Sequence, residues 1–367
     1  MAIAKYGASK PRRKKKQRKT KLGATKQMPL RKPLGGENIN CYLKLGINLF
    51  LSLEKLPMKK RLLSALCLLS LSVFGCTAPS TTDVTSPTEN ETSTTAVQPL
   101  VTGAIPDQDP EKLQRLYGLL ADYLSAELGV PVEYKPVTDY LAAVTAFKVG
   151  DLDLVWFGGL TGVQARLQVP GAEAIAQRDI DAEFHSVLIA NVNSGLGELA
   201  SDADLTQVKG KTLTFGSESS TSGRLMPQYY LEQAGVSLED FQGEVGFSAS
   251  HDATIQLVEA GTYDLGMLNE QVWNSRVEAG EVDTNRVNVI WRSPAYYDYH
   301  WVISPDVDER YGEGFRDKVQ QALLQLDPNN PDHKEILDLF GATQFIQTSN
   351  ENYAEIEAVG RQIGKIQ

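Results

Sequence analysis

The stretch GSESSTSGRLMPQYYLEQAG, residues 216–235, places a serine-rich turn directly before a helix that has a proline in its first turns. Pro227 has no amide hydrogen, and its ring clashes with the carbonyl four residues back, at Gly223. A regular helix therefore begins no earlier than about Gly223. The amides of residues 220–224 then have no partner inside the helix, and another acceptor has to satisfy them.

This turn brings hydroxyl groups, unpaired amides and the positive end of a helix dipole together, which suits a tetrahedral oxyanion. Several charge-assisted hydrogen bonds of about 1.5–3 kcal/mol each would hold such an anion without a full positive charge. The simpler alternative is that one serine caps the helix. A cap needs one such residue, and four occur in a row, so the pattern favours an anion site formed by Ser219, Ser220, Thr221 and Ser222.

Strand-like and helix-like stretches alternate on both sides of the turn. Strands alternating with helices of this length are typical of parallel sheets covered by helices, which predicts an α/β fold. The expected strands are 101–106, 131–137, 153–159, 211–217, 243–250 and 263–268, and the expected helices are 111–129, 139–150, 223–235 and 251–261.

One pattern occurs twice along the chain. A helix starts at an aromatic or imidazole residue, Tyr140 or His251, reaches a glycine ten residues later, and leads to an aspartate, Asp153 or Asp264, after thirteen. The repetition predicts two similar lobes, with helix N-termini at the carboxyl ends of strands lining the cleft between them.

Two β-rich runs, 185–191 and 294–304, are expected to be hinge strands that cross between the lobes. The first lobe would then contain 98–188 and 294–367, and the second would contain 189–293. The predicted architecture is thus two Rossmann-like lobes joined by hinge strands.

The N-terminal part has the composition of an export signal. Residues 58–75 carry a basic start and a short apolar stretch, and VFGC then places Cys76 where bacterial lipoproteins are lipidated. We therefore expect translation to begin at Met58, with 1–57 as a misassigned extension, and 76–97 as a disordered Ser/Thr/Pro tether. A nucleic-acid-binding arm is the alternative for the basic run at 11–21. The protein would be a periplasmic, membrane-anchored lipoprotein.

Charge is divided unevenly along the chain. Of the 36 Lys and Arg residues 18 precede residue 76, and of the 46 Asp and Glu residues only two do, which leaves residues 76–367 with a net charge of −26. This disfavours nucleic acid or an anionic membrane surface as a partner. An anionic ligand would need local donors that act against an unfavourable overall field.

Catalytic and metal chemistry is poorly supported. GSESS lacks the GxSxG pattern of esterases, no GK[ST] follows the glycine, and the four histidines lack metal-ligand spacing. Ser220, His251 and Asp298 form a formal triad set, but such sets occur in almost any sequence. We expect a binding protein without metal or cofactor; a hydrolase is the less favoured alternative.

Three stretches, SESSTSGRLMPQYYL (217–231), SASHDATIQLVEAG (248–261) and WRSPAYYDYHWV (291–302), resemble the periplasmic phosphonate- and phosphite-binding proteins of ABC transporters. The resemblance covers 98–367 and implies a type II periplasmic-binding fold that closes on its ligand about a hinge, and delivery of the ligand to a permease and its ATPase. It also implies the following roles: phosphonyl oxygens held by Ser220, Thr221 and Ser222, further donors in Tyr140 and His251, and acceptors for a ligand amine in Glu270 and Asp298.

Some residues depart from the family pattern. His185 stands where relatives commonly have tyrosine, and aromatic residues near the expected site would shrink it to fit a compact anion: Trp156, Phe157, Tyr296 and Tyr299. IPDQDPEKLQRLYG (105–118) and VWFGGLTGVQARLQVPGA (155–172) are similar to a subgroup often labelled as selenate-binding. Phosphite or a small phosphonate is the expected ligand, with selenate or another oxyanion as the alternative. A ligand-sensing lobe is a further alternative, and a monomer is expected.

Overall fold

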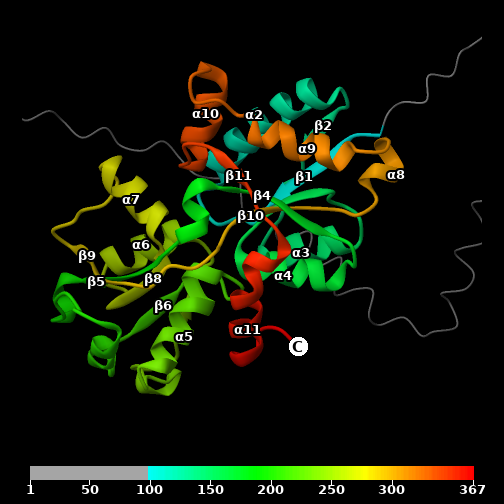
Figure 1. The fold of residues 1–367 in the computed structure, drawn as a ribbon. Coiled ribbons are helices and arrows are strands. Elements are labelled where there is room, and N and C mark those ends of the chain that lie inside the picture. The colour runs from blue at the N-terminus through cyan, green and yellow to red at the C-terminus, as the bar shows by residue number, and fades with distance from the viewer. Residues whose placement is uncertain (1–97) are drawn as a thin grey trace, which may run out of the picture. The chain divides into compact units, whose positions relative to one another are not determined.

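The computed structural model describes residues 98–367, which belong to one compact unit and form two sheets flanked by helices (Figure 1). The expected extension, signal peptide, lipidated Cys76 and tether all lie outside the described residues. Within 98–367, no helix is both long and apolar enough to cross a membrane.

The first sheet has six strands in the order β11-β4-β10-β3-β1-β2. Strand β1 runs parallel to β2 and β3, whereas β10 runs antiparallel to both β3 and β4. The strands are β1 (Leu100–Ala104), β2 (Val132–Tyr134), β3 (Leu154–Phe157), β4 (Glu173–Arg178), β10 (His300–Ile303) and β11 (Phe345–Gln347).

The second sheet has five strands in the order β7-β6-β8-β5-β9. Strand β6 runs parallel to β7 and β8, and β5 runs antiparallel to β8 and β9. The strands are β5 (Ser186–Asn191), β6 (Leu213–Phe215), β7 (Gly246–Phe247), β8 (Leu265–Asn269) and β9 (Val287–Arg292).

Each sheet therefore contains a parallel trio, as the alternating pattern predicts, followed by an antiparallel strand next to it. The alternating pattern does not predict the antiparallel strands β10 and β5, which enter their sheets after the chain has crossed between the lobes and so run in the opposite direction. The α/β class and the type II architecture are confirmed.

Helices cover the two sheets, and Figure 1 shows α2, α9 and α10 beside the first sheet and α5, α6 and α7 beside the second. The helices are α2 (Pro110–Leu128), α3 (Tyr140–Lys148), α4 (Gly159–Gln168), α5 (Met226–Gln233), α6 (His251–Glu259), α7 (Glu270–Glu278), α8 (Val307–Tyr311), α9 (Phe315–Leu324), α10 (Pro331–Phe340) and α11 (Ala354–Gln362). Short 3-10 turns are η2 (Asp179–Glu183), η3 (Val192–Ser194), η4 (Asp202–Val208), η6 (Leu238–Asp240) and η7 (Asn350–Tyr353), and η5 (Thr221–Leu225) is a π turn.

The repeated sequence pattern corresponds to repeated geometry. The Asp153 carboxylate accepts from the amide of Val101 at 2.8 Å, and the Asp264 carboxylate accepts from the amide of Thr212 at 2.9 Å. In both lobes this aspartate stands directly before the third strand of the trio and ties it to the first. The same side chain in the same place explains why the pattern recurs in the sequence.

The chain crosses between the sheets at a single antiparallel bridge. The amide of Phe184 donates to the carbonyl of Tyr296 at 2.9 Å, and the amide of Tyr296 donates back at 3.0 Å. Strand β5 lies wholly in the second sheet, so this crossing falls a few residues before the lobe boundary expected at residue 188. The lobe boundaries themselves stay a prediction.

Candidate functional site

The serine-rich turn forms a π turn, η5, that continues into α5. Its start at Thr221 is two residues earlier than the sequence predicts. A π turn bonds five residues back rather than four, so it tolerates Pro227 where a regular helix would clash. The expectation that helical structure begins near Gly223 is thus corrected by the wider turn.

Two carbonyls of this turn, those of Ser222 and Gly223, receive no helical donor, because Pro227 lacks an amide hydrogen and the bonding changes there from five residues back to four. Other parts of the chain supply the missing donors. The hydroxyl of Ser186, at the start of β5, donates to the Ser222 carbonyl at 2.8 Å, and the Gly216 amide donates to the Gly223 carbonyl at 3.0 Å. The proline therefore fixes the turn to the crossing strand instead of to its own helix.

Ser220 caps this turn, since its Oγ accepts from the amide of Gly223 at 2.9 Å. The capping alternative is therefore confirmed for one serine. The hydroxyl proton of Ser220 remains available as a donor. Ser219 is half-buried outside the turn, whereas Thr221 and Ser222 are buried within it.

Three buried polar atoms in this region have no hydrogen-bond partner among the described residues: Tyr140 Oη, Ser222 Oγ and Asp298 Oδ2. Burial, with the nearby carboxyl groups of Asp107 and Asp298, raises the pKa of Tyr140 well above 10, and the Ser220 hydroxyl opposes this shift. Tyr140 is thus a neutral donor held close to the turn. Buried polar atoms are normally paired, so three unpaired ones mark a place where a polar ligand fits.

Asp298 lies immediately before β10 and faces the N-terminus of α4. Its Oδ1 accepts from the amide of Gly159 at 2.8 Å. Burial raises the pKa of Asp298 to about 7; the Gly159 and Thr221 hydrogen bonds lower it, and the negative charge of Asp181 raises it further. This carboxyl group is therefore able to gain or lose a proton near neutral pH.

His251 is fully buried at the start of α6, and burial lowers its pKa to about 4, so its ring is neutral at neutral pH. Its Nδ1 accepts from the Asn269 amide at 3.4 Å, which assigns the ring proton to Nε2. Nε2 then donates to the Tyr299 hydroxyl at 3.2 Å, and Asn269 Nδ2 donates to the same oxygen at 3.0 Å.

The Tyr299 oxygen accepts from both groups, so its own proton is left for an acceptor, and the nearby Asp107 carboxyl group can take this role, since the Tyr299 hydroxyl lowers its pKa. Asp107 is 3 % exposed, and burial raises its pKa to about 6, while the Tyr299 hydrogen bond opposes the shift. Sequence reasoning missed Asp107. Its position just past the carboxyl end of β1 was the signal, because that edge of an α/β sheet is where ligands bind. Ser186 and Asn269 were missed as well, and Tyr296 was expected only as an aromatic residue that makes the site smaller.

Trp156 and Phe157 do not face the same side. As neighbours in β3 they point to opposite faces of the first sheet. The Trp156 ring stacks on Tyr299 with centroids 5.7 Å apart, and the Phe157 ring packs against Phe147 at 5.9 Å. Only Trp156 therefore borders the donor cluster around Tyr299.

His185 and Glu270 line a cavity of about 740 Å³ to which both lobes contribute, and no residue of the serine turn is part of its lining. His185 Nδ1 donates to the Ser293 carbonyl at 2.7 Å. Both oxygens of Glu270 accept from Arg292, at 2.6 and 2.7 Å. In this arrangement the Glu270 carboxylate is already paired, which argues against its expected role as an acceptor for a ligand amine.

The site lacks the geometry of a serine hydrolase. Both nitrogens of His251 are engaged by Tyr299 and Asn269, and Asp298 Oδ1 is engaged by Gly159. Ser220, His251 and Asp298 therefore form no proton relay. Within residues 98–367 no cluster of three or more His, Cys, Asp or Glu side chains could hold a metal ion.

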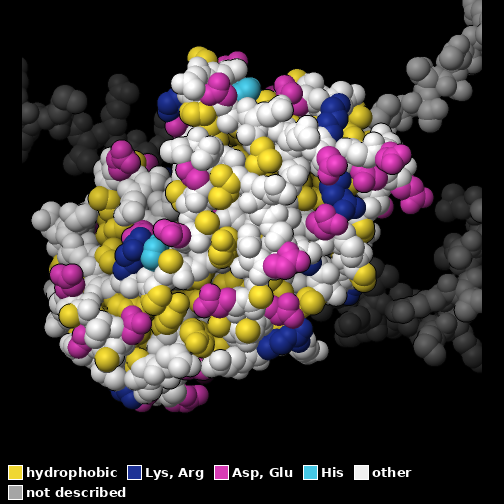
Figure 2. All heavy atoms as spheres, in the orientation of Figure 1, with side chains coloured by type: hydrophobic (Ala, Val, Ile, Leu, Met, Phe, Trp, Pro, Cys, Tyr) yellow, Lys and Arg dark blue, Asp and Glu magenta, His cyan; other side chains and the backbone are white. Residues whose placement is uncertain are grey.

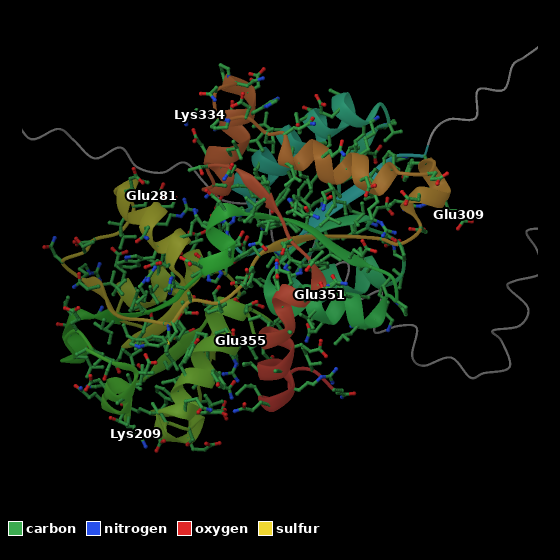
Figure 3. The ribbon with its side chains drawn as sticks, viewed as in Figure 1. Lys209, Glu281, Glu309, Lys334, Glu351 and Glu355 are labelled. Atoms are coloured by element: carbon green, nitrogen blue, oxygen red, sulfur yellow. The ribbon has the colours of Figure 1, made fainter. Side chains whose placement is uncertain are left out.

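Charged side chains lie mainly at the periphery of the molecule. Figure 2 shows acidic groups scattered over the visible face with fewer basic ones among them. In Figure 3 the labelled side chains of Lys209, Glu309 and Lys334 lie at the outside of the molecule. The buried donors of the site are instead hydroxyl, amide and neutral imidazole groups, in keeping with the acidic composition of the folded region.

Known proteins resemble this chain over most of the part that the structure describes. Residues 102–353 match the family described as ABC transporter, phosphonate, periplasmic substrate-binding protein. The chain is 49 % identical over 268 residues to the probable ABC transporter phosphite binding protein PhnD1 of Prochlorococcus marinus (strain MIT 9301), covering 73 % of this chain and 90 % of that protein. It is 26 % identical over 254 residues to the phosphonates-binding periplasmic protein of Escherichia coli (strain K12), covering 68 % and 72 % of the two chains.

Solved structures show the same relationship. The structure of Prochlorococcus marinus PhnD1 in complex with methylphosphonate superimposes with a TM-score of 0.72 and covers 73 % of this chain and 98 % of that one, at 49 % identity. A binding-protein component of an ABC phosphonate transporter from Pseudomonas aeruginosa shares the fold at 20 % identity, with a TM-score of 0.62, covering 71 % and 85 % of the chains.

Proposed function

Because this chain belongs to the family of periplasmic phosphonate-binding proteins of ABC transporters, we propose that it captures phosphite or a small phosphonate between its two lobes and delivers it to a permease. Binding uses neutral donors, and no bond of the ligand is broken. The observation that carries this proposal is the group of buried, unpartnered atoms at the serine turn: Tyr140 Oη, Ser222 Oγ and Asp298 Oδ2.

The donors suit a compact anion with one proton left on it. Tyr140, Ser220 and Ser222 each offer a hydroxyl proton, and the first turn of η5 adds backbone amides and the positive end of its dipole. Asp298 Oδ2 can only accept while it is ionised, so it pairs with a protonated ligand oxygen and repels a bare one. This combination favours a monoanion that both accepts and donates.

The finer parts of the proposal rest on the sequence. Cys76 and the apolar stretch before it support a lipid anchor in the membrane facing the periplasm.

His251 acts on the ligand through Tyr299 or directly once the lobes rearrange, and Glu270 takes no part while it is paired with Arg292. A monomer suffices for this function, since both lobes come from one chain.

Isothermal titration tests the proposal. The protein is titrated with phosphite, methylphosphonate, 2-aminoethylphosphonate, phosphate, sulfate and selenate, alongside Ser220→Ala, His251→Ala and the exposed control Ser201→Ala. We expect tight binding of phosphite or methylphosphonate by the wild type and the control, and a loss of about tenfold or more in each site variant. A preference for selenate or sulfate would replace the phosphorus ligand by another oxyanion. No binding across the panel would refute the proposal.

A further inference from the structure

We propose that Thr221 is a positioning residue that holds the lobes closed over an occupied site, by capping the N-terminus of α4 from the opposite lobe. The inference rests on the proposed function for the identity of the occupant, but the contact itself exists independently of any ligand. It assigns to Thr221 a role different from the direct ligand contact that the family resemblance implies.

Helix α4 cannot cap itself. Its N-cap residue is Gly158, which has no side chain to accept from the first-turn amides. Two side chains from elsewhere do so instead. The Gly159 amide donates to Asp298 Oδ1 at 2.8 Å, and the Leu160 amide donates to Thr221 Oγ1 at 2.9 Å. Asp298 lies beside the first sheet, whereas Thr221 belongs to η5 beside the second, so the latter bond joins the lobes.

The glycine pair at the start of α4 makes room for this contact. A Cβ atom on Gly158 would lie 3.2 Å from Thr221 Oγ1 and 3.4 Å from Asp298 Oδ1, and one on Gly159 would lie 3.4 Å from Thr221 Cγ2. These distances are tight for a real side chain. The sequence FGG at this point thus permits an approach between the lobes that larger residues would prevent.

The hydroxyl oxygen of Thr221 is used within the protein. It accepts from the Leu160 amide of the opposite lobe at 2.9 Å. Thr221 is 2 % exposed. The neighbouring Ser222, by contrast, has a buried hydroxyl without a partner. Within one turn, therefore, Ser222 is left to meet a ligand and Thr221 is committed to the opposite lobe.

Asp298 connects the interlobe contact to the ligand site. One of its oxygens, Oδ1, belongs to the cap of α4, while Oδ2 is buried and unpartnered. A ligand that donates to Oδ2 would fix the orientation of the carboxylate and, through the Gly159 bond to Oδ1, the N-terminus of α4 that Thr221 also caps. Occupation of the site and closure of the lobes then favour each other.

The test measures lobe separation and ligand release in the full chain. Cys41, Cys67 and Cys76 are replaced by serine, and spin labels are placed at the exposed positions Asp317→Cys in α9 and Glu239→Cys in η6. The variants are Thr221→Val, which keeps the shape but loses the hydroxyl, and Thr221→Ser, which keeps the hydroxyl. Thr102→Val is the control, because the Thr102 hydroxyl donates to the Leu154 carbonyl within one sheet.

We expect Thr221→Val to shift the ligand-free protein toward longer label distances and to release methylphosphonate about tenfold faster, with Thr221→Ser close to wild type and Thr102→Val unchanged in both measurements. A Thr221→Val protein with faster release but an unaltered ligand-free distance distribution would overturn the proposal and leave Thr221 as a ligand donor. An equal shift in Thr102→Val would also overturn it. If the wild type bound no ligand of the panel, the proposed function would fail, and the ligand-free distances would still decide the role of Thr221.

Discussion

The hydroxyl of Ser186 donates to the carbonyl of Ser222 at 2.8 Å, and so joins the first residue of the crossing strand β5 to the anion-binding turn. The same hydroxyl lies 2.6 Å from the Tyr296 hydroxyl on the second crossing segment. The turn is thus anchored to both connections between the lobes. This anchoring exists because Pro227 removes the helical donor that would otherwise satisfy Ser222.

Ser186→Ala should therefore weaken ligand binding without a change in any ligand-contacting side chain. Loss of the buried hydroxyl leaves the Ser222 carbonyl unpaired, at a cost of about 1–3 kcal/mol, and frees the turn to move. We expect a roughly tenfold loss of methylphosphonate affinity by titration. Ser194→Ala is the control: it removes a buried hydroxyl that accepts from Leu196 within η3 and its flank, and its affinity should match wild type. Equal affinities for both variants would contradict this view of Ser186.

Ligand affinity should fall as the pH rises from about 6 to about 9. Burial holds the pKa of Asp298 at about 7, so one proton is shared between this carboxylate and the ligand near neutral pH. At higher pH both groups are ionised, and binding requires uptake of a proton, which costs up to about tenfold in affinity per pH unit.

The measurement is titration across this pH range in buffers of different ionisation enthalpy, which also reports the proton uptake. In Asp298→Asn the decrease of affinity with pH should disappear, since no carboxylate remains at this position to share a proton with the ligand. An affinity that rises with pH in the wild type would refute the protonated-ligand account.

Asp107→Asn should stabilise the ligand-free protein above about pH 6 and have little effect at pH 4. Burial raises the pKa of Asp107 from 3.8 to about 6, so the folded state binds a proton more strongly than the unfolded state, and stability is lost as the pH rises between these values. Above about pH 6 the full cost of the buried charge is present. Removing that charge should raise the free energy of unfolding by about 2 kcal/mol at pH 8 and leave it nearly unchanged at pH 4.

Urea unfolding at the two pH values checks this prediction. Asparagine keeps an oxygen that accepts from Tyr299, so the hydrogen-bond chain to His251 remains possible. A variant that is equally destabilised at both pH values would show that the Asp107 carboxylate contributes to the folded structure. It would contradict the view that the buried charge lowers the stability of the protein.

Arg292→Met should relax the discrimination against phosphonates with a cationic tail. In the wild type both Glu270 oxygens are paired with Arg292, so we expect weaker binding of 2-aminoethylphosphonate than of methylphosphonate. Freeing the carboxylate should improve 2-aminoethylphosphonate affinity by about five- to tenfold, a modest gain because the pair is partly exposed. Methylphosphonate affinity should stay constant, and Arg292→Lys should retain the wild-type preference. If the ratio of 2-aminoethylphosphonate affinity to methylphosphonate affinity is unchanged in Arg292→Met, Glu270 does not lie near the bound ligand.

Two glycine-to-alanine substitutions in helices should change stability in opposite directions. A Cβ on Gly162 in α4 would lie 2.3 Å from His300 Nε2, and His300 is stacked on Tyr353 with centroids 3.7 Å apart. Gly162→Ala should cost about 1–3 kcal/mol through overpacking. Gly118 in α2 has nothing within 4 Å, and Gly118→Ala should gain about 0.5–1 kcal/mol from helix propensity. Thermal unfolding of both variants measures the difference, and a tolerated Gly162→Ala would mean that His300 is free to move.

Much of the architecture could be predicted from local pattern. The alternating strands and helices, the ends of α2 at Asp109 and Gly129, and the doubled helix-glycine-aspartate unit all depend on contacts within a few tens of residues. Their physical causes, namely capping, left-handed glycine and hydrophobic periodicity, are properties of short segments. The β-rich runs that contain β5 and β10 could be predicted, but their antiparallel direction could not, because pairing partners far along the chain decide it.

The amino-acid sequence by itself determined that a serine-rich turn precedes a proline-containing helix, that this turn brings hydroxyls and amides together, and that the surrounding lobes are acidic. Only the tertiary structure decided the use of each side chain: Ser220 as a cap, Ser222 with an unpaired hydroxyl, and Thr221 in contact with the opposite lobe. It also placed Asp107 and Tyr299 in one hydrogen-bond chain with His251. The reason is physical. A hydroxyl group has one proton to give, and which acceptor receives it depends on atoms that folding brings together from distant parts of the chain.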